Sequence, residues 1–295
     1  MTTQEALKTE GRGTFSPAPI AFGILLVGYL ALVVGFAWNP TPLAQALAAI
    51  GIVLAILHAT LFYGARDALT IFAICSTITF AMENLGALTG FPFGQHHFEV
   101  GANLPHVGLI PVIVGPLWFG MGYFSWILAG TLLGAPARPA RKFELLAWPV
   151  VAAFVMTQWD VVMDPPLSTI SKAWIWHDGG AHFGVPLSNY GGWLLTSWLF
   201  YQAFAIYLGR RPDLPELIPA RTRALRLMAI ALYLGSGLTH LMPWLTGQSG
   251  EVADAAGHLW RIADLRATSV LTMLLTMVFT SLLAVLRLAT PNPAR

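Results

Sequence analysis

The stretch that decides the fold is residues 157–193, TQWDVVMDPPLSTISKAWIWHDGGAHFGVPLSNYGGW. It places Asp160 and Asp164 near the end of an apolar segment. A loop rich in Trp, His, Gly and Pro follows before a second apolar segment begins. Carboxyl groups at the mouth of a membrane helix are costly and usually mark function. The two aspartates are therefore the first candidates for a site.

The composition is that of a membrane protein with several spans. Of 295 residues, 56% are hydrophobic and 10% are charged, whereas soluble domains carry about 25% charged residues. A single cysteine, Cys75, excludes a disulfide framework and a multi-cysteine metal site. The polar first 16 residues lack an apolar core with a cleavage site, so we expect the first span to act as an uncleaved insertion signal.

Eight stretches hold the roughly 20 mostly apolar residues that a transmembrane helix needs. They lie near residues 19–38, 42–62, 68–88, 107–133, 143–163, 190–208, 225–244 and 268–288. No internal repeat or domain-separating linker is visible. We therefore expect an all-α polytopic membrane bundle of about eight transmembrane helices. The chain is expected to consist of a polar tail over residues 1–17, one transmembrane domain over 18–289 and a C-terminal tail over 290–295.

The basic residues predict the orientation of these spans. Eight spans put both termini on one side, and of the 16 Lys and Arg the opposite side keeps Lys172, Arg261 and Arg266. Positive charge marks cytoplasmic loops, so both termini are expected in the cytoplasm. These basic residues serve as topology signals and headgroup contacts rather than as a nucleic-acid patch. The longer loops on the other side, which is periplasmic in a bacterial inner membrane, carry most histidines and acids, so the active site is expected in the non-cytoplasmic half.

A third acid joins the aspartates. Glu83 stands well inside the third apolar stretch, where a carboxyl group must be neutral or paired. The alternative is a purely structural role, in which Glu83 forms a hydrogen bond to Asn84 or to a backbone carbonyl. Asp160 and Asp164 share a helix face, and two close carboxyl groups favour one protonated and one ionised member. Asp164 could instead simply close its helix before the prolines.

Aromatic side chains crowd the same region. Many would be an interfacial belt, but some are suited to line a pocket for an extended apolar molecule and to stabilise a cation. The candidates are Phe91, Phe93, Trp118, Trp159, Trp174, Trp176, Tyr190 and Trp193.

The histidines do not predict a metal site. No HExxH or comparable spacing occurs, and the adjacent His96 and His97 would point apart in an extended chain. His58 and His240 lie near opposite sides or helix ends, which does not suit a haem. We expect no metal and no cofactor.

Three blocks of this sequence resemble the CruF-type carotenoid 1,2-hydratases, a family of carotenoid-biosynthesis membrane proteins that includes bisanhydrobacterioruberin hydratases. The blocks are ENLGALTGFPFG at 83–94; 111–118 with Tyr123; and Trp159-Asp160 through Asp164-Pro165, with Trp174-Ile175-Trp176 and GVPLSNYGGW at 184–193. They cover roughly residues 80–193. The family usually places tyrosines after the Phe-Gly of the first block, whereas this chain has Gln95-His96-His97-Phe98.

The resemblance implies that water is added across the terminal 1,2 double bond of an acyclic carotenoid end, lycopene-like or gamma-carotene-like, without a redox cofactor. The product is a tertiary alcohol. Protonation of an unactivated alkene needs a carboxyl group kept neutral in a dry site. On this basis Asp160 is assigned as proton donor, with Glu83 or Asp164 orienting the water. Asn189, from the third block, joins the aromatic residues as a substrate-binding candidate.

Two other classes of function are alternatives. A lipid or small-molecule transporter would need polar residues along a path to both faces, and a metal-dependent membrane hydrolase would use the outer histidines. The expected partners are an acyclic carotenoid, water and the lipid bilayer, with other carotenoid-pathway enzymes as an additional option.

Overall fold

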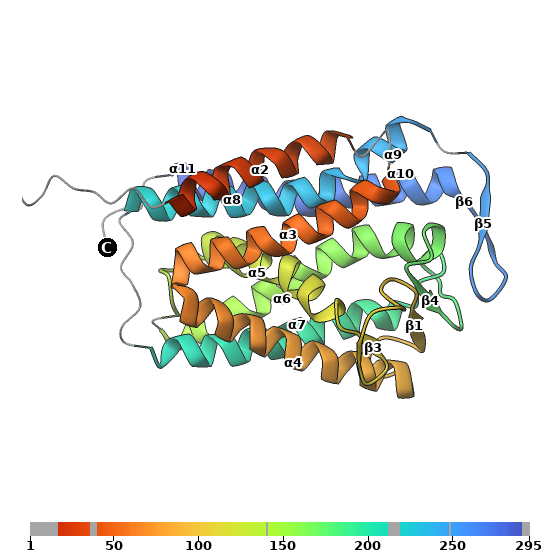
Figure 1. Cartoon of the computed structure of the whole chain (residues 1–295), viewed down its shortest axis with the longest axis horizontal. Coiled ribbons are helices and arrows are strands. Elements are labelled where there is room, and N and C mark those ends of the chain that lie inside the picture. The colour runs from red at the N-terminus through yellow and green to blue at the C-terminus, as the bar shows by residue number, and fades with distance from the viewer. Residues whose placement is uncertain (1–16, 36–39, 140, 212–218, 248, 291–295) are drawn as a thin grey trace, which may run out of the picture.

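Helices occupy all eight apolar stretches in the computed structural model, which describes residues 17–35, 40–139, 141–211, 219–247 and 249–290. The helices run roughly along the long axis of the molecule (Figure 1). Their bounds are α2 (Pro17–Gly35), α3 (Pro40–Tyr63), α4 (Ala65–Thr89), α5 (Val114–Leu132), α6 (Lys142–Asp164), α7 (Leu187–Gly209), α8 (Pro219–Leu238), α9 (Leu241–Leu245), α10 (Ile262–Met273) and α11 (Phe279–Ala289). Two π-helical segments, η1 (Pro165–Ile170) and η2 (Leu274–Val278), extend α6 and join α10 to α11.

Five of the described helices are long and apolar enough to cross a membrane, judged by length and composition: Ala46–Tyr63, Ala65–Thr89, Lys142–Ile170, Pro219–Leu245 and Ile262–Ala289. The predicted all-α membrane bundle is therefore confirmed. The number of eight spans and the cytoplasmic termini stay predictions. Residues 1–16 and 291–295, most of the two predicted tails, lie outside the described residues.

Helix α5 forms the centre of the bundle and contacts α3, α4, α6, α8 and α11. Its glycines let aromatic side chains lie directly on its backbone, as small residues do between membrane helices. A Cβ atom at Gly130 would lie 2.2 Å from the Trp148 ring. That ring stacks on Trp126, with the centroids 4.3 Å apart. The apolar, glycine-rich sequence of α5 thus explains why this helix is the buried one.

Three two-stranded antiparallel sheets lie at one end of the bundle (Figure 1). They pair β1 (His96–Phe98) with β4 (Trp174–Trp176), β2 (His106–Val107) with β3 (Ile110–Pro111), and β5 (Glu251–Ala253) with β6 (Leu259–Arg261). The β1–β4 sheet matters most for the site, because it joins the loop after α4 to the loop after α6. In its register His96 lies opposite Trp176.

Three predicted helix starts were wrong. The fourth helix begins at Val114 rather than at residue 107, because the β2–β3 hairpin takes up the preceding residues. The Asn84 amide holds this hairpin by donating to the Val107 carbonyl and accepting from the Leu109 N–H. The proposal that Asp164 merely closes its helix also fails, since the chain continues into η1 and Asp164 makes no capping hydrogen bond with its side chain. The other two helices begin earlier than predicted: α8 begins at Pro219 rather than at residue 225, and α10 begins at Ile262 rather than at residue 268.

Phe93 is a wedge between α4 and α7. Its side chain is 1% exposed, and Ser188 at the start of α7 donates to its carbonyl oxygen at 2.8 Å. A Cβ atom would lie 2.7 Å from the Phe93 ring at Gly86 and 2.4 Å from it at Gly192. Glycine is therefore required on both helices to seat the ring.

We expect Gly192→Ala to destabilise the protein by about 1–3 kcal/mol, the usual cost of overpacking, because the new methyl group displaces Phe93. Thermal unfolding of the purified protein in detergent measures the effect. Gly191→Ala is the matched control, since a Cβ there meets nothing within 4 Å, and its unfolding temperature should stay the same or rise slightly. Equal destabilisation by both substitutions would contradict the wedge.

Candidate active site

Asp160 and Asp164 lie fully buried on one face of α6 and share a single amide. The Nδ2 atom of Asn189, on α7, donates to Asp160 Oδ2 at 3.0 Å and to Asp164 Oδ2 at 2.6 Å. An amide nitrogen carries two hydrogens, so it can donate to both. The i, i+4 spacing on α6 and one side chain of α7 are enough to bring the pair together.

The two aspartates differ in their remaining partners. Asp164 Oδ1 accepts from the indole N–H of Trp174 at 2.8 Å and from that of Trp176 at 3.2 Å. Asp160 Oδ1 is buried and has no hydrogen-bond partner among the described residues. Asp164 therefore has three N–H donors and Asp160 has one.

Glu83, 4% exposed on α4, is held by two donors from other elements. The indole N–H of Trp118 on α5 donates to Oε1 at 2.9 Å. His96 Nε2 on β1 lies 3.0 Å from Oε2. The bland alternative in which Glu83 bonds to Asn84 or a backbone carbonyl is not what the structure has, because Asn84 binds Phe80 and the β2–β3 hairpin instead.

The hydrogen bond between His96 Nε2 and Glu83 Oε2 requires a proton on one of these two atoms. His96 Nδ1 lies 2.9 Å from the Gly94 carbonyl oxygen, which can only accept, so Nδ1 carries a hydrogen. The hydrogen bond at Nε2 then requires a second proton, placed either on the imidazole or on Glu83. In both cases one proton lies between the two side chains.

Electrostatics favours placing that proton on His96. Burial by itself lowers the pKa of His96, but the hydrogen bond and charge of Glu83, the Gly94 carbonyl and the charge of Asp164 outweigh it, so the pKa lies above the ordinary 6.5. The contribution of Asp164 indicates that the Glu83–His96 pair and the Asp160–Asp164 pair act on each other.

Aromatic rings pack between the Glu83–His96 pair and the Asp160–Asp164 pair. Trp176 lies against His96, with ring centroids 4.9 Å apart. Trp118, which binds Glu83, stacks on Trp193 with a centroid distance of 3.8 Å, and Trp193 also contacts Trp159. The result is one cluster of three carboxyl groups with an indole-rich wall, which we call the carboxyl cluster: Glu83, His96, Asp160, Asp164 and Asn189.

The structure gathers most of the predicted site residues and leaves Phe91 outside the cluster. Phe93, Trp118, Trp159, Trp174, Trp176, Asn189 and Trp193 all belong to the cluster or its wall. Phe91 is apart, with its side chain 59% exposed. Tyr190 directs its hydroxyl group to His182 Nδ1, at 2.5 Å. No group of three or more His, Cys, Asp or Glu that could hold a metal ion occurs in the described part of the chain.

Sequence reasoning did not identify His96 as the partner of Glu83. It did predict that His96 and His97 point apart, and on β1 His96 is 2% exposed while the His97 side chain is 51% exposed. The alternation of inward and outward side chains in an extended segment could have identified His96. An inward histidine near a glutamate inside the membrane bundle can serve as its counter-charge.

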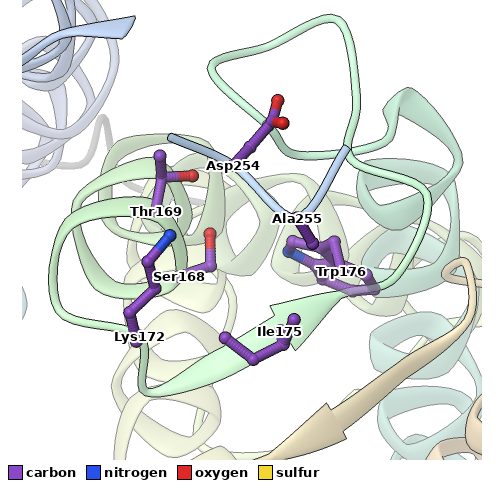
Figure 2. A pocket seen from close by; sticks show the side chains of 8 residues that line it. Ser168, Thr169, Lys172, Ile175, Trp176, Asp254 and Ala255 are labelled. Atoms are coloured by element: carbon purple, nitrogen blue, oxygen red, sulfur yellow. The ribbon is translucent and has the colours of Figure 1, made fainter. Parts of the chain in front are cut away.

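A cavity of about 150 Å³ lies at the loop end of the bundle, and Figure 2 shows the side chains that line it. Trp176 and Ser168 line it, and both also contact Asp164: Trp176 through its indole N–H and Ser168 by donating to the Asp164 backbone carbonyl. Trp176 therefore contacts both the cavity and the carboxyl group of Asp164.

The chain is similar to known carotenoid-biosynthesis proteins. A family model described as carotenoid biosynthesis protein matches residues 42–259, more than half of the chain. The bisanhydrobacterioruberin hydratase of Haloarcula japonica is 28% identical over 120 residues, which is 40% of this chain and 38% of that protein. The matched region thus spans well under half of the length of this relative. No solved structure matches the chain.

We expect the Glu83–His96 contact to make stability depend on pH. Because the pKa of His96 is raised by folding, its contribution is complete below the pKa of an unfolded histidine, about 6.5, and is lost as pH rises through the folded pKa. The unfolding temperature of the wild type should therefore fall more steeply over that range than that of His96→Gln. The exposed neighbour supplies the control, His97→Gln, which should keep the wild-type slope. Identical slopes for wild type and His96→Gln would rule out a protonated His96.

Proposed function

The chain belongs to the carotenoid biosynthesis protein family, and on that premise we propose that it is a carotenoid 1,2-hydratase. Its substrate would be an acyclic carotenoid end group, lycopene-like or gamma-carotene-like, and its product a tertiary alcohol. The reaction adds water and is redox-neutral, so it requires no redox cofactor. The relative named as a hydratase supports this class of reaction.

The observation that carries the proposal is the unequal number of N–H donors that hydrogen-bond to the two aspartates. Asp164, with three N–H donors, is the better stabilised anion, since hydrogen bonds to a charged carboxylate favour that form. Asp160, with one donor and an unpartnered Oδ1, is the better place for a proton. A buried carboxyl pair that holds one proton is suited to act as acid and base in one site.

The aspartate pair can both give the proton that the reaction needs and take one back. Asp160 gives its proton to the terminal alkene, so a C–H bond forms, the π bond breaks and a tertiary carbocation results. A water molecule oriented by Asp164 attacks the cation, and a C–O bond forms. The oxonium ion loses a proton to a carboxylate of the pair, which returns to its one-proton state.

The surrounding side chains supply what the cation requires. Faces of Trp118, Trp159, Trp176 and Trp193 can stabilise it, at about 2 kcal/mol for a desolvated cation–π contact. Two ionised aspartates add a negative potential while the cation exists. Glu83 is balanced by His96 and so acts as fixed electrostatic support in this scheme.

The apolar helices agree with a substrate that is taken from the bilayer. We propose an inner-membrane location, with the carboxyl cluster in the non-cytoplasmic half. The distribution of Lys and Arg supports this orientation.

We expect Asp160→Asn to lower hydration by about 100-fold or more, the usual scale for removal of a general acid. Asp164→Asn should also reduce it strongly, because water orientation and proton return are lost. Glu83→Gln should have a smaller effect. Pigment analysis of lycopene-producing cells, with each variant normalised to its amount in the membrane, measures the change.

Glu99→Gln is the control acid, because its side chain is 56% exposed and bonds His97 outside the cluster. It should hydrate like the wild type. Full activity of Asp160→Asn would remove Asp160 as the donor. A wild-type chain that leaves the pigments of such a host unchanged would argue against hydration itself.

A further inference from the structure

The loop-end cavity has a role that the acid chemistry alone does not explain. A cavity of about 150 Å³ is about ten times the roughly 10–15 Å³ that a site needs, on the same kind of volume, to hold one water molecule. Figure 2 shows Ser168, Thr169 and Lys172 on one side, Trp176 and Ala255 on the other, and Asp254 at the top of the view. The hydroxyl groups of Ser168 and Thr169 and the ammonium group of Lys172 in its wall provide polar partners that bound water needs.

The inner wall of the cavity leads to Asp164. Trp176 donates its indole N–H to Asp164 Oδ1 at 3.2 Å, and Ser168 donates to the Asp164 carbonyl oxygen at 2.9 Å. Trp176 itself is 6% exposed. A molecule in the cavity is therefore one side chain away from the carboxylate to which we assign water orientation.

The outer wall is the turn between β5 and β6, and it is firmly tied down. Asp254, 8% exposed, accepts from the Trp260 indole and the His258 backbone N–H, each at 2.9 Å. Burial alone raises the pKa of Asp254, but these hydrogen bonds outweigh it and hold the pKa below its ordinary value. Lys172 donates to the Ala253 carbonyl oxygen at 2.6 Å, so the turn is fastened to the chain just before β4.

We propose that this cavity is the water-binding vestibule of the carboxyl cluster, from which the reacting water passes Trp176 to Asp164. This inference rests on the proposed hydratase activity and adds the route of its second substrate. The carotenoid enters from the apolar side of the bundle, whereas water enters from the loop end. Separate routes keep bulk water away from Asp160 until the cation has formed.

Filling the vestibule and removing the proton donor have different effects on the reaction. If the vestibule is filled, Asp160 still protonates the alkene, and the cation still forms. With no water to capture it, the cation loses the original hydrogen of C2 back to the carboxylate, and the 1,2 double bond forms again. In D₂O the acid delivers deuterium to C2, so this return leaves deuterium on C2 of the recovered carotenoid.

The test is Ala255→Trp, which adds an indole to the lining of the cavity and fills it, with Ala255→Leu as a smaller side chain at the same position. Ala253→Trp is the matched control, because Ala253 is exposed in the same hairpin and does not line the cavity. Membranes holding each variant are incubated with lycopene in D₂O buffer, and hydrated product and deuterium in recovered lycopene are measured by mass spectrometry. Ala255→Trp should hydrate about tenfold less than the wild type, and Ala255→Leu should fall between them. In both, deuterium per hydrated product should rise, while Ala253→Trp should match the wild type.

Three results would overturn the vestibule: unchanged hydration in Ala255→Trp, equal loss in Ala253→Trp, or parallel loss of hydration and deuterium exchange. The last result would mean that the acid step, not water delivery, was damaged. Absence of hydrated product from wild-type membranes would instead reject the hydratase activity itself, and the vestibule with it.

Discussion

Three carboxyl groups lie buried in one end of a membrane-type bundle, and the rest of this region depends on supplying them with N–H donors. An uncompensated charge in such a place is prohibitively costly. The donors are side chains of α5, α7, β1 and β4, so each carboxyl group ties at least two segments together. The β1–β4 sheet is the clearest consequence, because it delivers His96 to Glu83 and Trp176 to Asp164 from opposite positions in one register.

Close packing makes this network possible. Phe93 fits only because Gly86 and Gly192 leave room on both flanking helices. The wedge sets the separation of α4 from α7 and thus the positions of Glu83 and Asn189. Tryptophan is well suited to the surrounding wall, since its ring packs as an apolar group while its N–H satisfies a carboxylate. Stability and the proposed chemistry therefore use the same side chains.

The asymmetry within the aspartate pair is the feature most relevant to function. Two side chains that look equivalent in sequence have one and three N–H donors, respectively. This difference assigns them unequal tasks in the proposed hydration. The adjoining cavity gives the same end of the bundle a second, polar approach, opposite in character to the apolar helices along which a carotenoid would arrive.

The sequence by itself determined the membrane class, the eight helical stretches and the candidate acids, because apolar length and isolated charges are properties of local composition. It also placed Asp160 and Asp164 on one face, which follows from helical periodicity. It did not reveal the β1–β4 pairing, the late start of α5 or the role of His96. These depend on contacts between segments up to 80 residues apart, such as His97 with His177, and such contacts leave no periodic signal. Only the tertiary structure decided which donor serves which carboxyl group, because that choice depends on how the helices and loops pack together.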